Sequence, residues 1–368
     1  MNNLEFEIVD APIKEAPFDP ALKWTPGLVD YDHHPAYKSL IGTSSFELRT
    51  KAMVQFWRSM IPLVFKRIIK YEMIPVEIRR PRSFGGYLTF AGVAARNALG
   101  LHGRNRADTP PSKVFSTLEQ DGCCVVRIPD ALLAEIEELA RPHFERLEQR
   151  RASRQTSDRD FDDSRSNVDA REHGDALYKI IERILIDSGI MDAASRYLGR
   201  DARLIDVNPQ INDSTDSFWR KIFPDLENMK LPDSAYFHRD ASGGDLKAIF
   251  YMTDVGPQNG PFSYVVGSNK LNMSKLDDLI AEANDHNGLS GTTLEARKRF
   301  AMLPSKLRQK GAFGNDLQDD SNLAQEIQRS TWQITSGRGS IVLFDTKGVH
   351  RGGMVVEGER RVITNVVG

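Results

Sequence analysis

The chain has 368 residues, of which 40% are hydrophobic and 27% are charged, as is typical of a globular protein in water. Its formal net charge of -2 argues against both a nucleic-acid-binding protein, which would be basic, and a disordered acidic chain. The start of the chain lacks the pattern of a signal peptide, and no run of roughly 18 apolar residues predicts a membrane-spanning helix. We therefore expect a cytoplasmic protein with no nucleic-acid partner.

The first 112 residues form an N-terminal extension that we expect to be partly helical and basic. Within 50–106 basic residues far outnumber the acidic ones, which are Glu72 and Glu77. A helix over 50–71 would carry one basic face and one apolar face rich in aromatic residues. Such a segment suits peripheral contact with a membrane, cover over an acidic substrate, or plain packing on the domain, and the sequence leaves these alternatives open.

From residue 113 to residue 368 the pattern predicts one mainly β domain. Apolar positions three or four residues apart predict helices that begin at Asp130, Asp175 and near Ala193. Short β-branched segments between turn residues predict strands. We expect an α+β protein whose β core is a double-stranded β-helix, or jelly roll, with flanking helices and a helical insertion. The predicted strands are 123–128, 202–208, 246–254, 261–266, 331–335, 339–344 and 353–367.

Two polar stretches interrupt this domain. Residues 151–175 contain few apolar side chains, which predicts a loop, and residues 271–330 form a charged, helix-prone insertion. Long segments of this kind often cover binding sites, so we expect the insertion to act as a lid.

The segment Phe237-His238-Arg239-Asp240 is the most informative in the chain. In a strand, residues i and i+2 project from the same face, so His238 and Asp240 can present a nitrogen and an oxygen to one metal ion. The best candidate for a third ligand is His350, which follows a predicted strand. Two histidines and one carboxylate are the facial triad of non-haem Fe(II) oxygenases.

Two other interpretations of these residue patterns fail. His143 and Glu145 have the same spacing, but they lie in a predicted helix, where such residues point roughly 200° apart and cannot share a metal. The His-Arg-Asp triplet also occurs in protein kinases, but the sequence has neither their glycine-rich loop nor their Asp-Phe-Gly motif.

The segments around the predicted ligands resemble the phytanoyl-CoA dioxygenase-like family of Fe(II)/2-oxoglutarate-dependent oxygenases. The resemblance covers 115–368 with gaps. It departs from the family pattern at Val266 and Asn269, where Pro and His are usual, but neither position is a ligand. The matching segments are His238-Arg-Asp240, Met252-Thr-Asp254, Asn259-Gly-Pro-Phe262, Val266-Gly-Ser-Asn269, the strand 339–345, His350 and Arg361.

This resemblance implies Fe(II), 2-oxoglutarate and O₂ as the reactive partners, with His238, Asp240 and His350 as the metal ligands. It also implies that Arg361, eleven residues after His350, binds the far carboxylate of 2-oxoglutarate. Its neighbour Arg360 would point to the opposite face of the strand as a surface charge, although the sequence leaves open which of the two arginines binds the cosubstrate. A carboxylate at Asp240 favours hydroxylation or desaturation over halogenation.

Two further polar residues are candidates for contact with the cosubstrate. Lys247 begins a strand predicted to face the site, although it would otherwise be a surface lysine. Gln210 lies in the polar segment 208–212, which either supplies amide hydrogen bonds or forms a turn at the end of a strand. The favoured function is oxidation of a C–H bond in a small or lipid-like substrate, with release of succinate and CO₂. The alternative is a catalytically silent jelly-roll protein that binds a small molecule.

Overall fold

The computed structural model describes residues 5–12, 46–71, 74, 76–79, 81–99, 110–153, 155, 168–169, 175–214, 237–240, 245–271, 274–284, 299, 302–310, 322–353 and 355–368. The helices are α2 (Phe46–Ile68), α3 (Val76–Arg79), α4 (Phe84–Ala98), α5 (Lys113–Asp121), α6 (Asp130–Ala152), α7 (Ala176–Asp187), α8 (Ile190–Leu198), α10 (Lys275–Asn284), α12 (Ser305–Lys310) and α13 (Asn322–Arg329). The strands are β1 (Glu7–Val9), β2 (Cys123–Arg127), β3 (Val168–Asp169), β4 (Leu204–Asp213), β5 (Leu246–Tyr251), β6 (Ser263–Val265), β7 (Thr331–Gln333), β8 (Ser340–Asp345), β9 (His350–Arg351) and β10 (Glu359–Val367).

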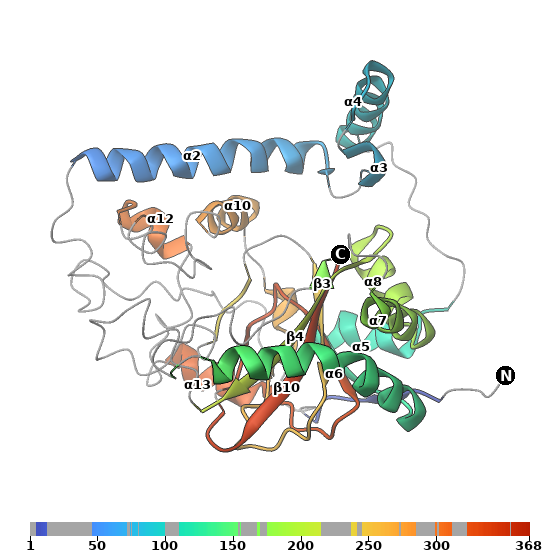
Figure 1. Cartoon of the computed structure of the whole chain (residues 1–368). Helices are drawn as coiled ribbons and strands as arrows, with labels where there is room; N and C mark the ends of the chain where they lie inside the picture. The colour runs from blue at the N-terminus through green and yellow to red at the C-terminus, as the bar shows by residue number, and fades with distance from the viewer. Residues whose placement is uncertain are drawn as a thin grey trace.

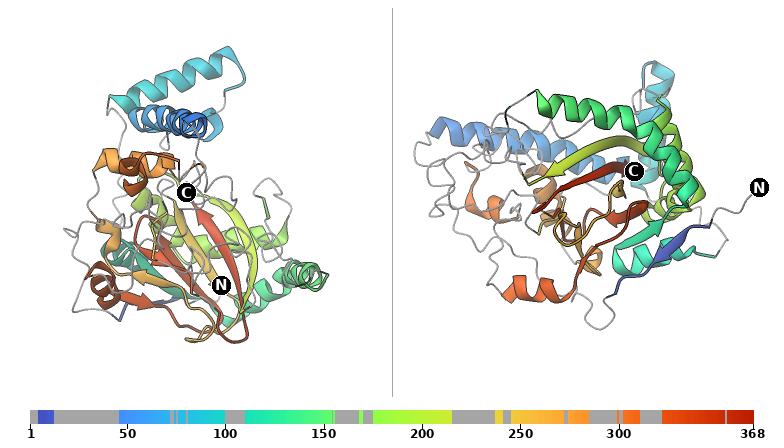
Figure 2. Two further views of the ribbon diagram at one scale, coloured as in Figure 1. Left: turned by 90° about the vertical axis from the view of Figure 1, so that its left-hand side faces the viewer. Right: turned by 60° about the horizontal axis from the view of Figure 1, so that its bottom comes forward.

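The strands form two antiparallel sheets. The larger sheet has the order β1-β2-β8-β5-β10-β4-β3, and the smaller has the order β7-β6-β9. An isolated antiparallel bridge between His238 and His350 extends the smaller sheet beyond β9. The two sheets face each other, with α5 to α8 on the outside of the larger one (Figures 1 and 2). The expected jelly roll with flanking helices is thus confirmed.

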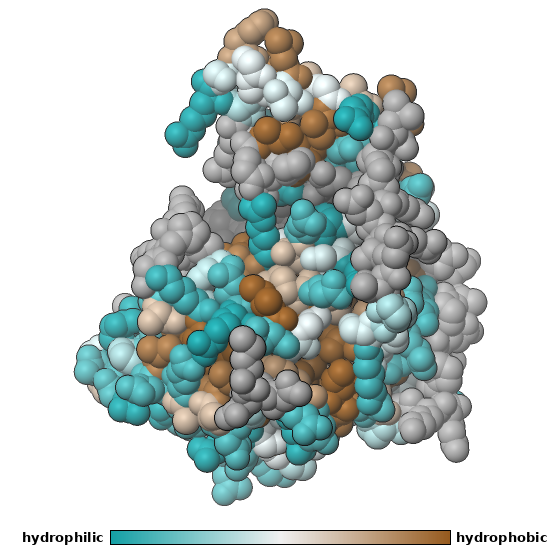
Figure 3. Space-filling view, turned by 90° about the vertical axis from the view of Figure 1, so that its right-hand side faces the viewer, coloured by the Kyte–Doolittle hydropathy of each residue, from teal (hydrophilic) through white to brown (hydrophobic). Residues whose placement is uncertain are grey.

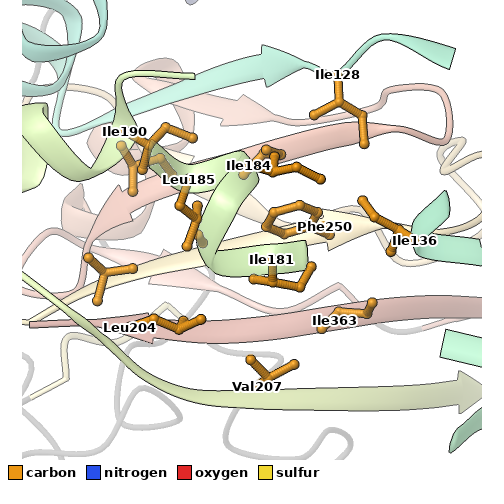
Figure 4. Packing of buried hydrophobic residues seen from close by; sticks show 14 of the residues in the cluster. Ile128, Ile136, Ile181, Ile184, Leu185, Ile190, Leu204, Val207, Phe250 and Ile363 are labelled. Carbon is orange, nitrogen blue, oxygen red and sulfur yellow. The ribbon is translucent and has the colours of Figure 1, made fainter. Parts of the chain in front are cut away.

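Each face of the larger sheet has its own hydrophobic core, because successive residues of a strand point to opposite sides. On the outer face, α7 and its neighbours pack over Phe250 and Ile363 (Figure 4). On the inner face, Tyr251 and Val362 pack toward the smaller sheet with Phe344. Even-numbered residues of β10 around Val362 therefore face the space between the sheets, and odd-numbered residues face the helices.

Most predicted elements are present with shifted ends. The segment 208–212 lies within β4 and forms no turn, because it pairs along its whole length with β10. The helix predicted to begin at Asp130 does so, but Pro129 is the residue at its N-cap, so Asp130 lies in the first turn. Most of the predicted loop 151–175 lies outside the described residues.

The N-terminal helices lie on the insertion. The helix α2 continues through Pro62 and packs on α10 and on residues 302–307, while α4 extends beyond α2 at the outermost part of the molecule (Figure 2). Within the described part of the chain, no helix is both long and apolar enough to cross a membrane. The domain boundary between residues 112 and 113 stays a prediction.

Candidate metal centre

Backbone pairing brings the three predicted ligands together. His238 and His350 each donate their backbone N–H to the other's carbonyl oxygen, at 2.8 and 2.9 Å, and the backbone N–H of Asp240 donates to the Thr346 carbonyl at 2.9 Å. The potential ligand atoms of His238, Asp240 and His350 all lie within 4.8 Å of one another. Among the described residues, this is the one group of three or more such side chains arranged to hold a metal ion.

The side chains of the triad point at a common centre. Asp240 Oδ1 lies 3.8 Å from Nε2 of His238 and 3.8 Å from Nε2 of His350. The Nδ1 atom of His350 lies 2.9 Å from the Gly348 carbonyl oxygen. Since a carbonyl only accepts, Nδ1 carries the proton, and Nε2 of His350 has its lone pair available to a metal.

The electrostatics hold Asp240 and His350 in the protonation states that a metal requires. Burial opposes ionisation of Asp240, but the charges of Lys247, His350 and His238 outweigh it and hold the pKa of Asp240 well below its usual range. Burial, together with the neighbouring His238, lowers the pKa of His350 to about 3. At neutral pH the site therefore offers a carboxylate and a neutral imidazole, as metal ligation demands.

Lys247 contacts the triad directly. Its ammonium group donates to Asp240 Oδ2 at 2.6 Å, which leaves Oδ1 directed at the two histidines. Lys247 lies in β5 opposite Val366, on the inner face of the larger sheet. The sequence placed Lys247 near the cosubstrate, whereas its observed partner is the ligand carboxylate.

The turn that carries His350 is fixed by contacts with β6 and the residues after it. The Tyr264 hydroxyl donates to the Asp345 carbonyl at 3.1 Å, and the Val349 N–H donates to Ser268 Oγ at 2.7 Å. A Cβ atom on Gly348 would overlap the Tyr264 hydroxyl, so this tight approach requires glycine.

An aromatic wall, which the sequence did not indicate, surrounds the buried ligand. The ring centroids of Phe344 and Phe262 lie 5.1 and 5.7 Å from that of His350, and the Tyr264 ring stacks parallel to it at 6.5 Å. Phe344 and Tyr264 lie on inner faces of the two sheets, so alternation within the predicted strands would have been the signal for them.

The structure does not place Arg361 where the sequence suggested. Arg361 precedes Val362 by one residue and so points to the outer face, where it forms ion pairs with Glu148 at 2.5 Å and Glu359 at 2.6 Å. Burial opposes the charge on Arg361, but Glu359 and Glu148 outweigh it and raise its pKa. This position does not fit the expected role in binding a cosubstrate between the sheets.

Arg360 occupies the face expected for that role. It lies two residues before Val362, on the inner side of β10. Burial raises the pKa of Tyr251 on this face, and the positive charge of Arg360 partly offsets that rise. Gln210 is buried on the same face, because it pairs directly with Val362. A count of residues from His350 cannot fix the face, because one residue more or less in the connection before β10 moves every side chain to the opposite face.

A jelly roll with two histidines and one carboxylate at a common centre defines the class of non-haem iron oxygenases, and the donor set fits Fe(II). A family model described as phytanoyl-CoA dioxygenase matches residues 118–362. The chain belongs to this family, whose members are iron- and 2-oxoglutarate-dependent oxygenases. No curated protein matches the chain.

Several solved structures are similar to parts of this chain. AviO1 from Streptomyces viridochromogenes Tue57 is 14% identical, with 72% of this chain and 96% of that chain covered and a TM-score of 0.39. SnoK, described as a non-heme alpha ketoglutarate dependent carbocyclase from nogalamycin biosynthesis, is 14% identical over 72% and 87% of the two chains, with a TM-score of 0.40. EctD from S. alaskensis with bound Fe is 14% identical over 72% and 79%, with a TM-score of 0.39.

Proposed function

We propose that the chain uses Fe(II), 2-oxoglutarate and O₂ to hydroxylate or desaturate an unactivated C–H bond of a small or lipid-like substrate. The observation that carries this proposal is the convergence of His238, Asp240 and His350 on one centre between the sheets. Iron with 2-oxoglutarate and O₂ supplies the oxidising power and releases succinate and CO₂. The residues of the chain supply ligation, orientation and a shielded environment.

Two of the ligands, His350 and Asp240, have different supporting contacts, and these would orient the metal. His350 is nearly fully buried and is held by its ring hydrogen bond to Gly348 and by the aromatic wall. Asp240 is held by Lys247, so one carboxylate oxygen faces the metal position while the other is occupied. Supporting contacts of this kind fix the direction of a ligand's lone pair and limit its motion.

Arg360 is our candidate for the partner of the far carboxylate of 2-oxoglutarate, with Gln210 beside it. A guanidinium offers two parallel donors to a carboxylate and stays charged at all working pH values. Arg360 meets the requirement that the donor lie on the inner face of β10, which Arg361 does not.

The insertion 271–330 suits the role of a cover over this site. Arg239, between two of the ligands, is largely buried; burial lowers its pKa, while the carboxylates of Asp278 and Asp345 act in the opposite direction. Asp278 belongs to α10, so a charge on this helix of the insertion influences the His-x-Asp segment. Access to the metal position would then depend on the position of α10.

Anaerobic addition of Fe(II) and 2-oxoglutarate, followed by exposure to O₂, tests the proposal. We expect a weak visible metal-to-ligand absorption band and then succinate. His350→Ala should lose both while keeping its far-UV circular dichroism, whereas His143→Gln, a histidine change on α6, should retain them. The alternative of a silent binding protein predicts neither band nor succinate in the unaltered chain, and that result would overturn the proposal.

A further inference from the structure

The helix α2 has two apolar faces, of which only one is covered. Ala52, Phe56, Met60 and Leu63 are buried against α10 and residues 302–307. A second apolar row lies on a different side of the helix. Its members are three or four residues apart, which keeps them together on that side. This row consists of Val54, Trp57, Ile61, Phe65 and Ile68, whose exposed fractions are 46%, 49%, 65%, 58% and 60%.

The helix α4 continues this apolar surface. A small cluster that contains Ile69, Ile74 and Ala94 attaches α4 to the end of α2. The opposite side of α4 exposes Phe84, Tyr87 and Leu88, with exposed fractions of 79%, 60% and 59%. In the space-filling view, hydrophobic side chains gather on the projecting part of the molecule that these helices form (Figure 3). Contiguous exposed patches of this kind mark interaction sites.

Positive charge borders the apolar surface. Exposed cations lie along α2 and at Arg82 just before α4. The exposed acid of α2 is Glu47, which pairs with Lys51. The helix α4 itself carries one charged residue, Arg96. The exposed cations beside the apolar residues are Arg58, Lys66, Arg82 and Arg96.

The combination of exposed aromatic and aliphatic side chains with a cationic border is complementary to an anionic lipid surface. Apolar side chains enter the boundary between headgroups and acyl chains, while arginine and lysine side chains reach the phosphates. Neither helix meets the requirement for crossing a bilayer, so the helices would lie in the plane of the interface.

The helices that carry this surface lie over α10, on one side of the jelly roll. Glu282 of α10 pairs with Arg67 of α2 at 3.1 Å. The helix α10 therefore contacts α2, and Figure 2 shows α10, α2 and α4 stacked outward from the sheets in that order.

We propose that the exposed rows of α2 and α4 form a docking surface for a bilayer that contains anionic phospholipids. The surface consists of Val54, Trp57, Ile61, Phe65, Ile68, Phe84, Tyr87 and Leu88 with their bordering cations. Docking in this way holds the α10 side of the jelly roll next to the membrane. It does not depend on catalysis, and so it stands or falls separately from the oxygenase activity.

Sedimentation of the full chain with vesicles tests the proposal directly. We expect binding to vesicles of phosphatidylcholine mixed with phosphatidylglycerol, and at least tenfold weaker binding to phosphatidylcholine alone. Added salt should weaken the binding, since exposed charges are screened over about 10 Å at 0.1 M ionic strength. Lipids brominated on the acyl chain should quench Trp57, and Trp57→Phe should remove that part of the quenching.

Matched variants separate this surface from general stickiness. A triple change of Trp57, Ile61 and Phe65 to Ser should reduce vesicle binding at least tenfold while the circular dichroism and succinate formation stay unchanged. The control Ile186→Ser, a 57% exposed residue of α7, should bind vesicles like the unaltered chain.

Three outcomes would overturn the proposal: no binding to the anionic vesicles, equal loss of binding in the triple variant and the Ile186→Ser control, or a stable dimer that buries Trp57 and excludes vesicles. Light scattering after size-exclusion chromatography detects that dimer. Succinate formation measured in the same samples shows whether the oxygenase proposal stands independently.

Discussion

Replacing Arg360 or Arg361 by alanine distinguishes the two faces of β10 in a single comparison. If 2-oxoglutarate binds between the sheets, Arg360→Ala removes the guanidinium that meets its far carboxylate. Arg361→Ala removes a neighbouring guanidinium of identical chemistry that lies on the outer face with Glu148 and Glu359. The pair thus controls for charge, size and position in the chain.

The expected effects differ by at least an order of magnitude. A hydrogen bond to a charged group contributes about 1.5–3 kcal/mol, so loss of a two-bond contact costs about 3–6 kcal/mol. At about 1.4 kcal/mol per tenfold change, the KM for 2-oxoglutarate should rise by about 100-fold or more in Arg360→Ala. The Arg361 side chain is 31% exposed and its partners Glu148 and Glu359 are 46% and 43% exposed, so each ion pair contributes only about 0.2–1 kcal/mol.

Succinate formation over a range of 2-oxoglutarate concentrations measures these values, and thermal unfolding measures stability. Arg361→Ala should leave the KM for 2-oxoglutarate within about twofold, because a substitution on the outer face that does not contact the cosubstrate should change its binding by only a few tenths of a kcal/mol. It should also lower Tm slightly. The reasoning is refuted if Arg361→Ala raises the KM strongly while Arg360→Ala does not. That result would mean that β10 has a register shifted by one residue.

Three other changes probe the site and the core. Lys247→Met should weaken Fe(II) binding by about 10- to 100-fold, the range typical for loss of a residue that hydrogen-bonds to a metal ligand, because Asp240 loses the donor to its Oδ2. An unchanged metal affinity in an equilibrium titration would contradict this. Gly348→Ala should lower both Tm and metal affinity because its Cβ overlaps Tyr264, and a variant with unaltered values of both would show that the turn can relax. Burial raises the pKa of Cys124 from 9.0 to about 12, so the native protein keeps a thiol proton that the unfolded chain loses as pH rises above 9. The free energy of unfolding of the protein should then fall by up to about 1.4 kcal/mol per pH unit between pH 9 and 12. Denaturant unfolding at a series of pH values measures this fall, which should be less steep in Cys124→Ala.

The sequence by itself determined the chemistry of the centre. The pairing of His238 with Asp240 depends only on the two-residue period of an extended chain, a local property that needs no tertiary information. The turn residues and β-branched segments likewise predicted most strands of the jelly roll, because each signal is contained within a few neighbouring residues.

Only the tertiary structure decided which arginine faces the site. The face of a residue in β10 depends on the register with β5 and β4, and that register depends on the length of the connection after β9. A count along the chain cannot supply it, since one residue more or less reverses the face. The sequence could not predict the contact of Lys247 with Asp240 for a related reason. Lys247 belongs to β5, whereas the segment that contains Asp240 pairs with residues 346–350, and only the fold brings the two together.

The extension shows the same division. The sequence of α2 indicated an apolar face and a basic one, because helical periodicity can be read from a single segment. It could not show that α10 and residues 302–307 cover only part of the apolar side. Which apolar residues are left exposed depends on the shape of the partner, and the partner of α2 comes from more than 200 residues away in the chain, as the ion pair between Arg67 and Glu282 shows.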